Sequence, residues 1–317
     1  MKKLKAGEVI DGKYQILALI GRGGMAFVYK AERFSDKKII AIKIPFTEFT
    51  EKLASCQKFK RAEKIGQMVD HPNIVKVFKH SSQTSMPYML MEYVNGPELT
   101  KLIKNKGPLP LKQILKIAIQ VCDALEYIHQ HQIIHHDIKP DNIMLTRDDD
   151  VKILDFGLAY AEKLKEEVWA DLISVGGTPV YMAPEQLQGV NDIRSDLYSL
   201  GIMMYEMATG KLPFRGDIQS LKHAHLTQTA VSPRVFNPQI SIGLEDVIKK
   251  AMVKKPSERY QNAFEMRRDI LNLAYAKEAE KKKKDYHYHR LILLLIVVII
   301  FAVIILVQLA RMVRQVY

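Results

Sequence analysis

The stretch HHDIKPDN, residues 135–142, is followed at residues 155–157 by DFG, and the sequence between them predicts how their polar side chains meet. Two apolar runs, Ile143 to Leu145 and Val151 to Leu154, are separated by a polar turn, a pattern that predicts a β-hairpin. The outer ends of a hairpin lie side by side. The end of the first stretch and the start of the second are therefore expected to face one small space.

Four side chains gather in this space. Asn142 comes just before the first predicted strand and Asp155 just after the second, with Asp137 and Lys139 on the loop that leads in. Two oxygen-bearing side chains beside a third carboxylate and an ammonium can hold Mg²⁺ on a polyphosphate while a hydroxyl is oriented for attack. The sequence therefore predicts a phosphoryl-transfer site.

These stretches resemble the H-R-D-x-K-x-x-N and D-F-G motifs of eukaryotic-type (Hanks-type) serine/threonine protein kinases, and most resemble the bacterial members. An ordered series of motifs is far more specific than any one of them, and the resemblance covers roughly Tyr14 to Ala274. The further motifs are a glycine-rich loop at Gly21 to Val28, a lysine strand at Ala41 to Lys43, Ala183-Pro184-Glu185, Ser195 to Gly201, and Arg259.

The resemblance implies an α+β, two-lobed protein kinase fold, with a small β-rich N-lobe that carries helix C and a larger helical C-lobe. The expected organisation is an N-terminal extension (1–13), a kinase domain (14–274, with the N-lobe at about 14–91 and the C-lobe at about 95–274), a basic juxtamembrane segment (275–290), one transmembrane helix (291–310) and a short tail (311–317).

The resemblance also assigns roles to the residues of the site. Asp137 is expected to orient the acceptor hydroxyl and accept its proton, and Lys139 to steady the γ-phosphate of ATP. Asn142 and Asp155 are expected to hold Mg²⁺, with Mn²⁺ as an alternative metal. Catalysis of this kind is mostly positioning and neutralisation of charge.

The glycine loop lies between two β-favouring runs, not between a strand and a helix, which argues against a dinucleotide fold and a Walker-type loop. Its third glycine position is Ala26, and a purely structural hairpin turn is the alternative. Lys43 interrupts an apolar strand, where an ammonium without a partner is costly to bury. The resemblance implies a set of nucleotide contacts: Ile20, Gly21, Gly23, Gly24, Val28, Ala41, Lys43, Met91 as gatekeeper, the backbone of Glu92 and Val94, and Met144. Without the resemblance, the apolar residues of this set would be interpreted as part of the hydrophobic core.

The activation segment indicates the substrate class. Residues 177–185 resemble the serine/threonine-kinase form, in which Thr178 hydrogen-bonds near the catalytic aspartate and lysine. Glu185 is expected to pair with Arg259 and tie the segment to the C-lobe. His136 stands where the family has an arginine that binds a loop phosphate, so activation-loop phosphorylation is expected to matter little.

Helix C departs from the family. Counting from Lys43, and back from His71, places the family's glutamate at Ala62, with Glu63 next to it. Consecutive helix residues differ by about 100° in direction, so Glu63 replaces the missing carboxylate only if the helix is rotated or irregular. Gly66 is a weak helix former that would permit such a distortion. We expect Glu63 to pair with Lys43; the alternative is that Glu63 faces solvent and Lys43 lacks this partner.

The C-terminal part predicts a membrane anchor. Leu291 to Val307 is seventeen consecutive apolar residues, and the stretch 291–310 would span about 30 Å as a helix, the thickness of a bilayer's hydrocarbon core. A buried core helix is the alternative. Residues 277–317 carry eight Lys or Arg against three Asp or Glu, and most of the basic residues precede the apolar run. The positive-inside rule therefore places residues 14–274 in the cytoplasm. The resemblance to bacterial kinases implies a bacterial cell, with the span in its inner membrane.

Composition agrees with this organisation. A chain of 317 residues with 48% hydrophobic composition is long enough for a large core. The N-terminus lacks the apolar region of a signal peptide. Cys56 and Cys122 are expected to be reduced core thiols, as suits a cytosolic domain. Lys281 to Lys284 either bind anionic lipids or form a solvated charge run, and the aromatic and histidine residues at 285–290 favour a membrane interface over a metal site.

The expected partners are ATP, protein substrates with Ser or Thr acceptors, and the membrane; no nucleic acid is expected, and a homodimer is left open. Two other functions are left open. One is a membrane-anchored pseudokinase or nucleotide-binding scaffold with little turnover. The other is a small-molecule phosphotransferase, which the segment from Thr178 to Glu185 disfavours.

Overall fold

The computed structural model describes residues 3–23, 26–46, 53–80, 87–164, 179–276 and Leu294, without the side chains of 53–55 and 58. Gly24, Thr178 and the predicted span at 291–310, except for Leu294, lie outside the described residues. The chain divides into two compact units, Met1–Ile270 and Leu271–Tyr317. In the described ranges, no helix combines the length and the apolar character needed to cross a membrane.

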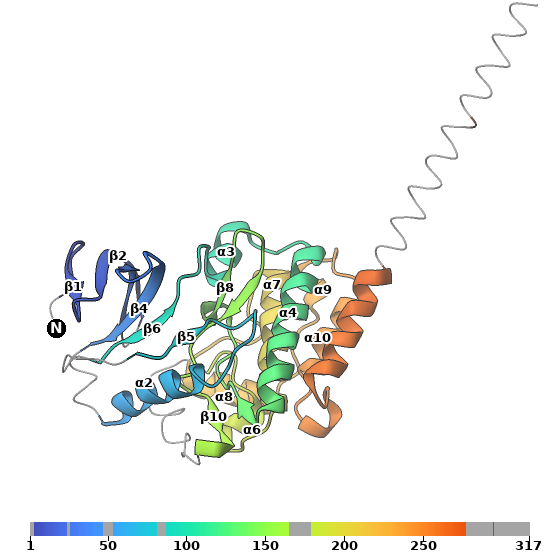
Figure 1. Ribbon diagram of the computed structural model, residues 1–317. Coiled ribbons are helices and arrows are strands. Elements are labelled where there is room, and N and C mark those ends of the chain that lie inside the picture. The colour runs from blue at the N-terminus through green and yellow to red at the C-terminus, as the bar shows by residue number, and fades with distance from the viewer. Residues whose placement is uncertain are drawn as a thin grey trace, which may run out of the picture. The chain divides into compact units, whose positions relative to one another are not determined.

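A six-stranded antiparallel sheet forms the N-terminal part of the first unit (Figure 1), in the order β1-β2-β3-β4-β6-β5. Its strands are β1 (Val9–Ile10), β2 (Tyr14–Arg22), β3 (Ala26–Arg33), β4 (Ile39–Pro45), β5 (Val77–Phe78) and β6 (Met89–Glu92). β1 lies within residues 1–13, which were predicted to be an extension, and it pairs with the start of β2. Val9 and Ile10 of that segment therefore belong to the sheet.

The alternation of side chains in β4 gives the sheet two different faces. Ile40, Ile42 and Ile44 are buried in one apolar cluster, so Ala41 and Lys43 point to the opposite face. In the antiparallel register, Lys43 lies opposite both a residue of β3 and a residue of β6. This second face carries the residues predicted to meet the nucleotide.

Helix α2 (Leu53–Gly66) packs against this second face through Ala62, which is buried in a cluster with Val77 and Met89. At its C-terminal end, Gly66 allows a close approach: a Cβ added there would lie 2.4 Å from Cγ2 of Val77. Gly66 was predicted to permit a distortion of the helix. The structure gives it a packing role, because α2 remains a regular helix and meets β5 at this glycine.

The C-terminal part of the first unit is helical, with one central helix. Helix α7 (Arg194–Thr209) is buried at every position except Arg194 and Glu206. Gly201 lets it approach α10, since an added Cβ would lie 2.8 Å from Cβ of Ala251. The other helices are α3 (Leu99–Lys106), α4 (Leu111–Gln130), α6 (Pro184–Leu187), α8 (Ile218–Thr227), α9 (Pro233–Phe236), α10 (Ile242–Ala251), a helix at 263–276, and the 3₁₀ turns η1 (Pro140–Asn142), η2 (Glu162–Leu164) and η3 (Pro256–Glu258).

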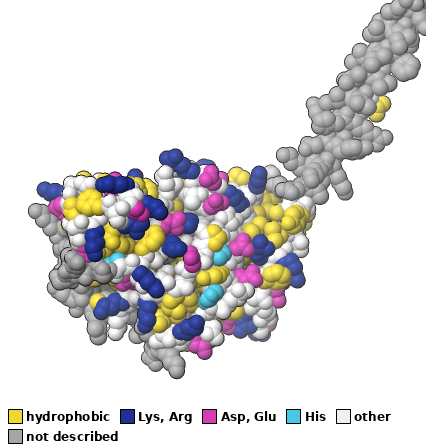
Figure 2. Space-filling model, viewed as in Figure 1, with side chains coloured by type: hydrophobic (Ala, Val, Ile, Leu, Met, Phe, Trp, Pro, Cys, Tyr) yellow, Lys and Arg dark blue, Asp and Glu magenta, His cyan; other side chains and the backbone are white. Residues whose placement is uncertain are grey.

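Two small antiparallel pairs carry the functional loops. β8 (Ile143–Leu145) pairs with β9 (Val151–Ile153), so the predicted hairpin is confirmed, and β7 (Ile133–Ile134) pairs with β10 (Tyr160–Ala161). Both cysteines are free, and Cys122 is buried. A β-rich N-terminal part and a helical C-terminal part fit the predicted two-lobed kinase fold. On the face shown in Figure 2, basic and acidic side chains are interspersed over the described surface.

The close contact at Gly66 generates a test of stability. Gly66→Ala improves helix propensity but forces a methyl group against Val77, so we expect it to lower the free energy of unfolding by about 1–3 kcal/mol. Urea denaturation measures this change. In a Gly66→Ala, Val77→Ala double variant the loss should be smaller than the sum of the two single losses. A stabilised Gly66→Ala variant would show that helix propensity outweighs packing here.

Candidate active site

The loop before β8 brings Asp137, Lys139 and Asn142 together. Nζ of Lys139 lies 2.7 and 2.8 Å from the two carboxylate oxygens of Asp137. Nδ2 of Asn142 donates both to the backbone carbonyl of Asp137 and to its Oδ2, each at 2.8 Å. The carboxylate of Asp137 is therefore held by an ammonium and an amide, which fix its orientation on this loop.

A buried carboxylate on α7 fixes the start of this loop. Oδ2 of Asp196 accepts from the backbone N–H of His135 at 2.9 Å and lies 2.8 Å from Nε2 of His129, while Oδ1 accepts from the N–H of His136 at 2.8 Å. Burial alone would raise the pKa of Asp196, but the hydrogen bond and charge of His129 hold it below its usual value. The sequence analysis missed this role, for which the signal was an acidic residue inside an apolar helix.

His136 occupies the position of the family's loop arginine, and it is buried in a left-handed turn with φ 62°. Its Nε2 lies 2.9 Å from Oδ1 of Asn191, and Gln186 donates to its carbonyl at 3.0 Å and approaches its Nδ1 at 3.2 Å. Burial lowers the pKa of His136. A neutral imidazole with amide partners on both nitrogens agrees with the prediction that this position does not bind a loop phosphate.

The hairpin brings its two ends together as predicted. The N–H of Leu154, the residue before Asp155, donates to the carbonyl of Asn142 at 2.8 Å. Asp155 has φ 58°, and its Oδ1 accepts from the N–H of Gly157 at 3.1 Å. This left-handed conformation at a residue other than glycine is the kind of local strain that occurs at functional sites.

Lys43 reaches across from β4 to this end of the hairpin. Its Nζ lies 2.6 Å from Oδ2 of Asp155, in a partly buried ion pair. Burial would raise the pKa of Asp155, but the charge and hydrogen bond of Lys43 hold it below its usual value. The two residues that the predicted chemistry needs, one for phosphates and one for a metal, are thus already adjacent.

The predicted pair between Glu63 and Lys43 is not formed in this structure. Oε1 of Glu63 lies 3.2 Å from Nε2 of His80 and 3.4 Å from Nε2 of Gln67. The physical reason is the regularity of α2: Ala62 faces the sheet, so the next residue points about 100° away from it. The prediction that Glu63 is the partner of Lys43 is therefore corrected, and so is the alternative that Glu63 faces solvent alone.

Five of the predicted nucleotide contacts lie on the second face of the sheet: Gly21, Val28, Ala41, Lys43 and Met91. Gly21 lies opposite Val28, Val28 opposite Lys43, and Ala41 opposite Met91, on four neighbouring strands. Gly23 closes the base of the glycine-loop hairpin by donating its N–H to the carbonyl of Ala26 at 3.0 Å, and Ile20 is exposed. The register therefore brings these residues together, while their contacts with a nucleotide stay a prediction.

The connection after β6 is fixed by Glu92. Its N–H donates to the carbonyl of Lys76 at 2.8 Å, and Nζ of Lys152 lies 2.8 Å from its Oε1. Lys152 is paired with Met144 in the β8–β9 hairpin, and Val94 is buried. The ion pair from Glu92 to Lys152 links the sheet to the hairpin, a connection that the sequence analysis missed.

A magnesium ion fits the chemistry of the residues present. Because Asn142 uses Nδ2 to hold Asp137, its Oδ1 is available as an oxygen ligand beside the carboxylate of Asp155. Amide and carboxylate oxygens are the ligands that Mg²⁺ prefers, and it usually keeps water and substrate phosphates as the remaining ligands. Among the described residues, no group of three or more His, Cys, Asp or Glu could hold a metal by itself.

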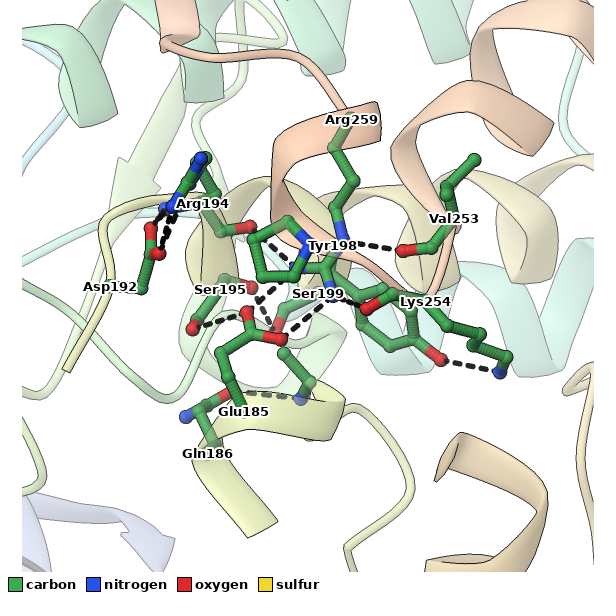
Figure 3. Close-up of polar contacts among 12 residues, drawn as sticks. Glu185, Gln186, Asp192, Arg194, Ser195, Tyr198, Ser199, Val253, Lys254 and Arg259 are labelled. Atoms are coloured by element: carbon green, nitrogen blue, oxygen red, sulfur yellow. Dashed lines mark hydrogen bonds and ion pairs between the residues drawn. The ribbon is translucent and has the colours of Figure 1, made fainter. Parts of the chain in front are cut away.

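The predicted ion pair between Glu185 and Arg259 is present and is bidentate, with two hydrogen bonds (Figure 3). Nη1 of Arg259 lies 2.6 Å from Oε1 of Glu185, and Nη2 lies 2.7 Å from Oε2. The side chains are 0% and 6% exposed, respectively. Arg259 also donates to the carbonyl of Lys254 at 2.7 Å, and Ser195 donates to Oε1 of Glu185 at 2.7 Å. The end of the activation segment is therefore anchored to α7 and to the chain after α10.

A second buried cluster surrounds Tyr198 next to this pair. Arg259 lies over the ring of Tyr198, whose hydroxyl is 3.0 Å from Nδ1 of His225 and 3.3 Å from Nζ of Lys254. Burial, followed by the charge of Lys254, lowers the pKa of His225 to about 4. Burial and the charge of Arg259 lower the pKa of Lys254 to about 8. The cluster therefore contains an imidazole that stays neutral in the folded protein.

Comparison with known proteins agrees with this geometry. Residues 14–271 match the family model described as the protein kinase domain. The chain is 40% identical over 266 residues to a probable serine/threonine-protein kinase of Clostridium perfringens, covering 83% of this chain and 38% of that protein. It is 38% identical over 266 residues to the serine/threonine-protein kinase PrkC of Bacillus subtilis (83% and 41% covered) and 35% identical over 270 residues to PknB of Mycobacterium leprae (83% and 43%). The chain spans about two fifths of the length of these relatives.

The buried pair predicts a large loss of stability when one partner is removed. Arg259→Met leaves the carboxylate of Glu185 buried without its cation, so we expect the free energy of unfolding to fall by about 3–5 kcal/mol. Arg268→Met removes an arginine from an exposed pair with Asp269 and is the matched control, with an expected change of about 0.5 kcal/mol or less. Equal changes in the two variants, measured by urea denaturation, would contradict the anchoring role.

His225 predicts how stability depends on pH. Its pKa is about 4 in the folded protein against 6.5 for an unperturbed imidazole. Between these two pH values the imidazole is mostly protonated in the unfolded chain and mostly neutral in the folded chain. This contribution to the free energy of unfolding is complete above pH 6.5 and is lost as the pH falls toward 4. The loss amounts to about 2 kcal/mol at pH 5. Urea denaturation at pH 7 and pH 5 measures this loss. In His225→Gln, which keeps a hydrogen-bond acceptor but does not titrate, the loss should be smaller by this amount; an identical loss in both proteins would contradict the assignment.

Proposed function

We propose, from the premise that this chain belongs to the protein kinase domain family, that it transfers the γ-phosphoryl group of ATP to serine and threonine hydroxyls of protein substrates. One observation carries the proposal. The carboxylate of Asp137 is held by Lys139 and Asn142 at the end of a hairpin whose other end is Asp155, and Asp155 is bonded to Lys43. This convergence of five chemically suited side chains from separate segments is what phosphoryl transfer requires.

Each residue has a part in this chemistry. Asp137 orients the acceptor hydroxyl and takes its proton, since its carboxylate is fixed by two donors on the loop. Lys139 and Lys43 supply positive charge on either side of the site, the first for the γ-phosphate and the second for the α- and β-phosphates. Positioning and charge neutralisation account for most of the rate enhancement in such sites.

Asn142 and Asp155 would hold Mg²⁺ through Oδ1 of the amide and the carboxylate oxygens. When bound, the metal supplies positive charge against the phosphate oxygens. In this structure Asp155 gives one of its oxygens to Lys43. Asp155 and Lys43 would each have to give up this contact, at least in part, to hold the metal and the phosphates.

We further propose that the kinase domain lies in the cytoplasm of a bacterial cell and is anchored to the inner membrane by residues 291–310. The support is the apolar sequence of this segment and the excess of Lys and Arg that precedes it. Lys281 to Lys284 would contact anionic lipid head groups in this arrangement. Insertion of full-length protein into vesicles, followed by protease digestion from outside, tests the topology.

A pseudokinase with little turnover is the second candidate function, and one observation favours it. Ala62 stands where the family has the glutamate of helix C, and the neighbouring Glu63 contacts His80 instead of Lys43. In protein kinases the lysine–glutamate pair and the metal-bound aspartate must both be in place for catalysis. A nucleotide-binding protein without turnover would keep Lys43 and Asp155 but would not need the oriented carboxylate of Asp137.

A single substitution separates the two candidates. Asp137→Asn keeps the volume of the side chain and one acceptor oxygen but removes the base, so we expect kcat for phosphoryl transfer to fall by about 10²–10⁴. Autophosphorylation with Mg-ATP, with the phosphorylated sites mapped by mass spectrometry, measures transfer and identifies the acceptor residues. Asp148→Asn, on the exposed turn of the β8–β9 hairpin, is the control and should keep wild-type activity. Wild-type protein no more active than Asp137→Asn would favour the pseudokinase.

A further inference from the structure

The attachment of α2 to the sheet differs from the one that the family's sequence pattern implies. Ala62, at the position of the family's glutamate, has no carboxylate and is packed against Val77 and Met89. Met89 is also the residue opposite Lys43 in the register of the sheet. The inward position beside Lys43 is therefore filled by a methyl group, and any polar link from α2 to the sheet must use another residue.

Glu63 makes this link through His80, the second residue after β5. Its Oε1 lies 3.2 Å from Nε2 of His80, and the side chains are 26% and 8% exposed, respectively. Nε2 of His80 also lies 2.9 Å from the carbonyl of Tyr88, immediately before β6. One imidazole nitrogen is thus hydrogen-bonded to a carbonyl at the start of β6 and lies close to a carboxylate on the helix.

The imidazole of His80 is held rigidly. Its ring stacks on the ring of Tyr88, with the centroids 4.3 Å apart and the planes at 16°. The hydroxyl of Tyr88 in turn donates to Asp11, and the ring of Tyr88 packs edge-on against Tyr14. The position of His80 is therefore determined by the apolar core of the sheet.

The hydrogen-bond partners also determine which nitrogen of His80 carries the proton. Nε2 faces two acceptors, so it must be the donor. Nδ1 is buried and has no hydrogen-bond partner in the part of the chain that the structure describes. The N–H at Nε2 donates to the carbonyl of Tyr88, and this same polar end of the ring faces the carboxylate of Glu63 at 3.2 Å.

We propose that the Glu63–His80 pair is the tether that positions α2 against the sheet, in place of the lysine–glutamate pair of the family. This inference rests on the proposed function, because it makes His80 a positioning residue for phosphoryl transfer. It acts through Glu63 and α2 and touches neither the nucleotide nor the acceptor. With the helix held in this way, Lys43 does not need to pair with a residue of α2 and can bind Asp155 and a phosphate group.

Phosphoryl transfer by the full-length protein tests the tether. His80→Phe keeps the aromatic stack on Tyr88 but removes the N–H, and Glu63→Gln weakens the acceptor. Each change should lower kcat by about tenfold to a hundredfold, because the helix loses its polar contact with the sheet, with a smaller change in KM for ATP. The double variant should lose no more than the more impaired single variant. His223→Phe, on the exposed side of α8, is the matched control and should keep wild-type kinetics.

Rescue gives a readout that loss of packing would not produce. Adding Ala62→Glu to His80→Phe restores a carboxylate at the inward position beside Lys43, so a folded Ala62→Glu, His80→Phe variant should recover kcat. The tether is overturned if His80→Phe keeps wild-type activity, if the two single losses add in the double variant, or if the folded rescue variant stays impaired. Higher activity in His80→Phe also overturns it, because His80 would then withhold Glu63 from Lys43.

Hydrogen exchange separates this inference from the proposed function. Amides of residues 56–66 should exchange faster in His80→Phe and in Glu63→Gln than in wild type or His223→Phe, whether or not the protein turns over. Inactive wild-type protein with this change in exchange would overturn the proposed function but support the tether. Active wild-type protein with unchanged exchange would overturn the tether alone.

Discussion

The carboxylate of Asp196 is the contact on which the geometry of the site depends. It lies at the centre of the helical part, on the helix with the most complete burial, and it accepts from the backbone of His135 and of His136 and meets the imidazole of His129. A buried carboxylate is costly unless its hydrogen-bonding capacity is used, and here both oxygens are occupied. The same bonds compensate for the left-handed backbone of His136, so the loop with Asp137 has one orientation relative to α4 and α7.

On the side of the sheet, the corresponding constraint is the alternation of side chains in β4. Burial of alternate isoleucines in one face obliges Lys43 to point toward the other, and the β8–β9 hairpin places Asp155 within reach. Neither contact requires a particular residue on α2. This explains how the inward position of the helix can hold Ala62 while the lysine keeps an acidic partner.

Much of the site follows from local sequence, and the exceptions have a common physical cause. Hairpin topology is encoded in short apolar runs and a polar turn, so the proximity of Asn142 and Asp155 was predictable. The pairing of Glu185 with Arg259 was predictable only through the family resemblance. The partner of Glu63 was not predictable, because His80 is near it only after α2 and β5 have packed together. The roles of Asp196, Gln186 and Lys152 were missed for the same reason: each bonds to a segment distant in sequence, and no local pattern marks the partner.

The segments of the helical part and helix α2 are held in place around the site by interactions of different strength. In the helical part, Glu185 and Asp196 are buried charges whose removal from their partners would be expensive, so displacement of the segments they hold is strongly opposed. Helix α2 is attached by the apolar contacts of Ala62, by the buried Ile65, by the close approach of Gly66 to Val77, and by a polar contact between the imidazole of His80 and the partly exposed carboxylate of Glu63. The free energy required to move an element locally follows the contacts that would be lost. The contact between Glu63 and His80 is partly exposed, so its loss should cost less free energy than the loss of the buried pair between Glu185 and Arg259.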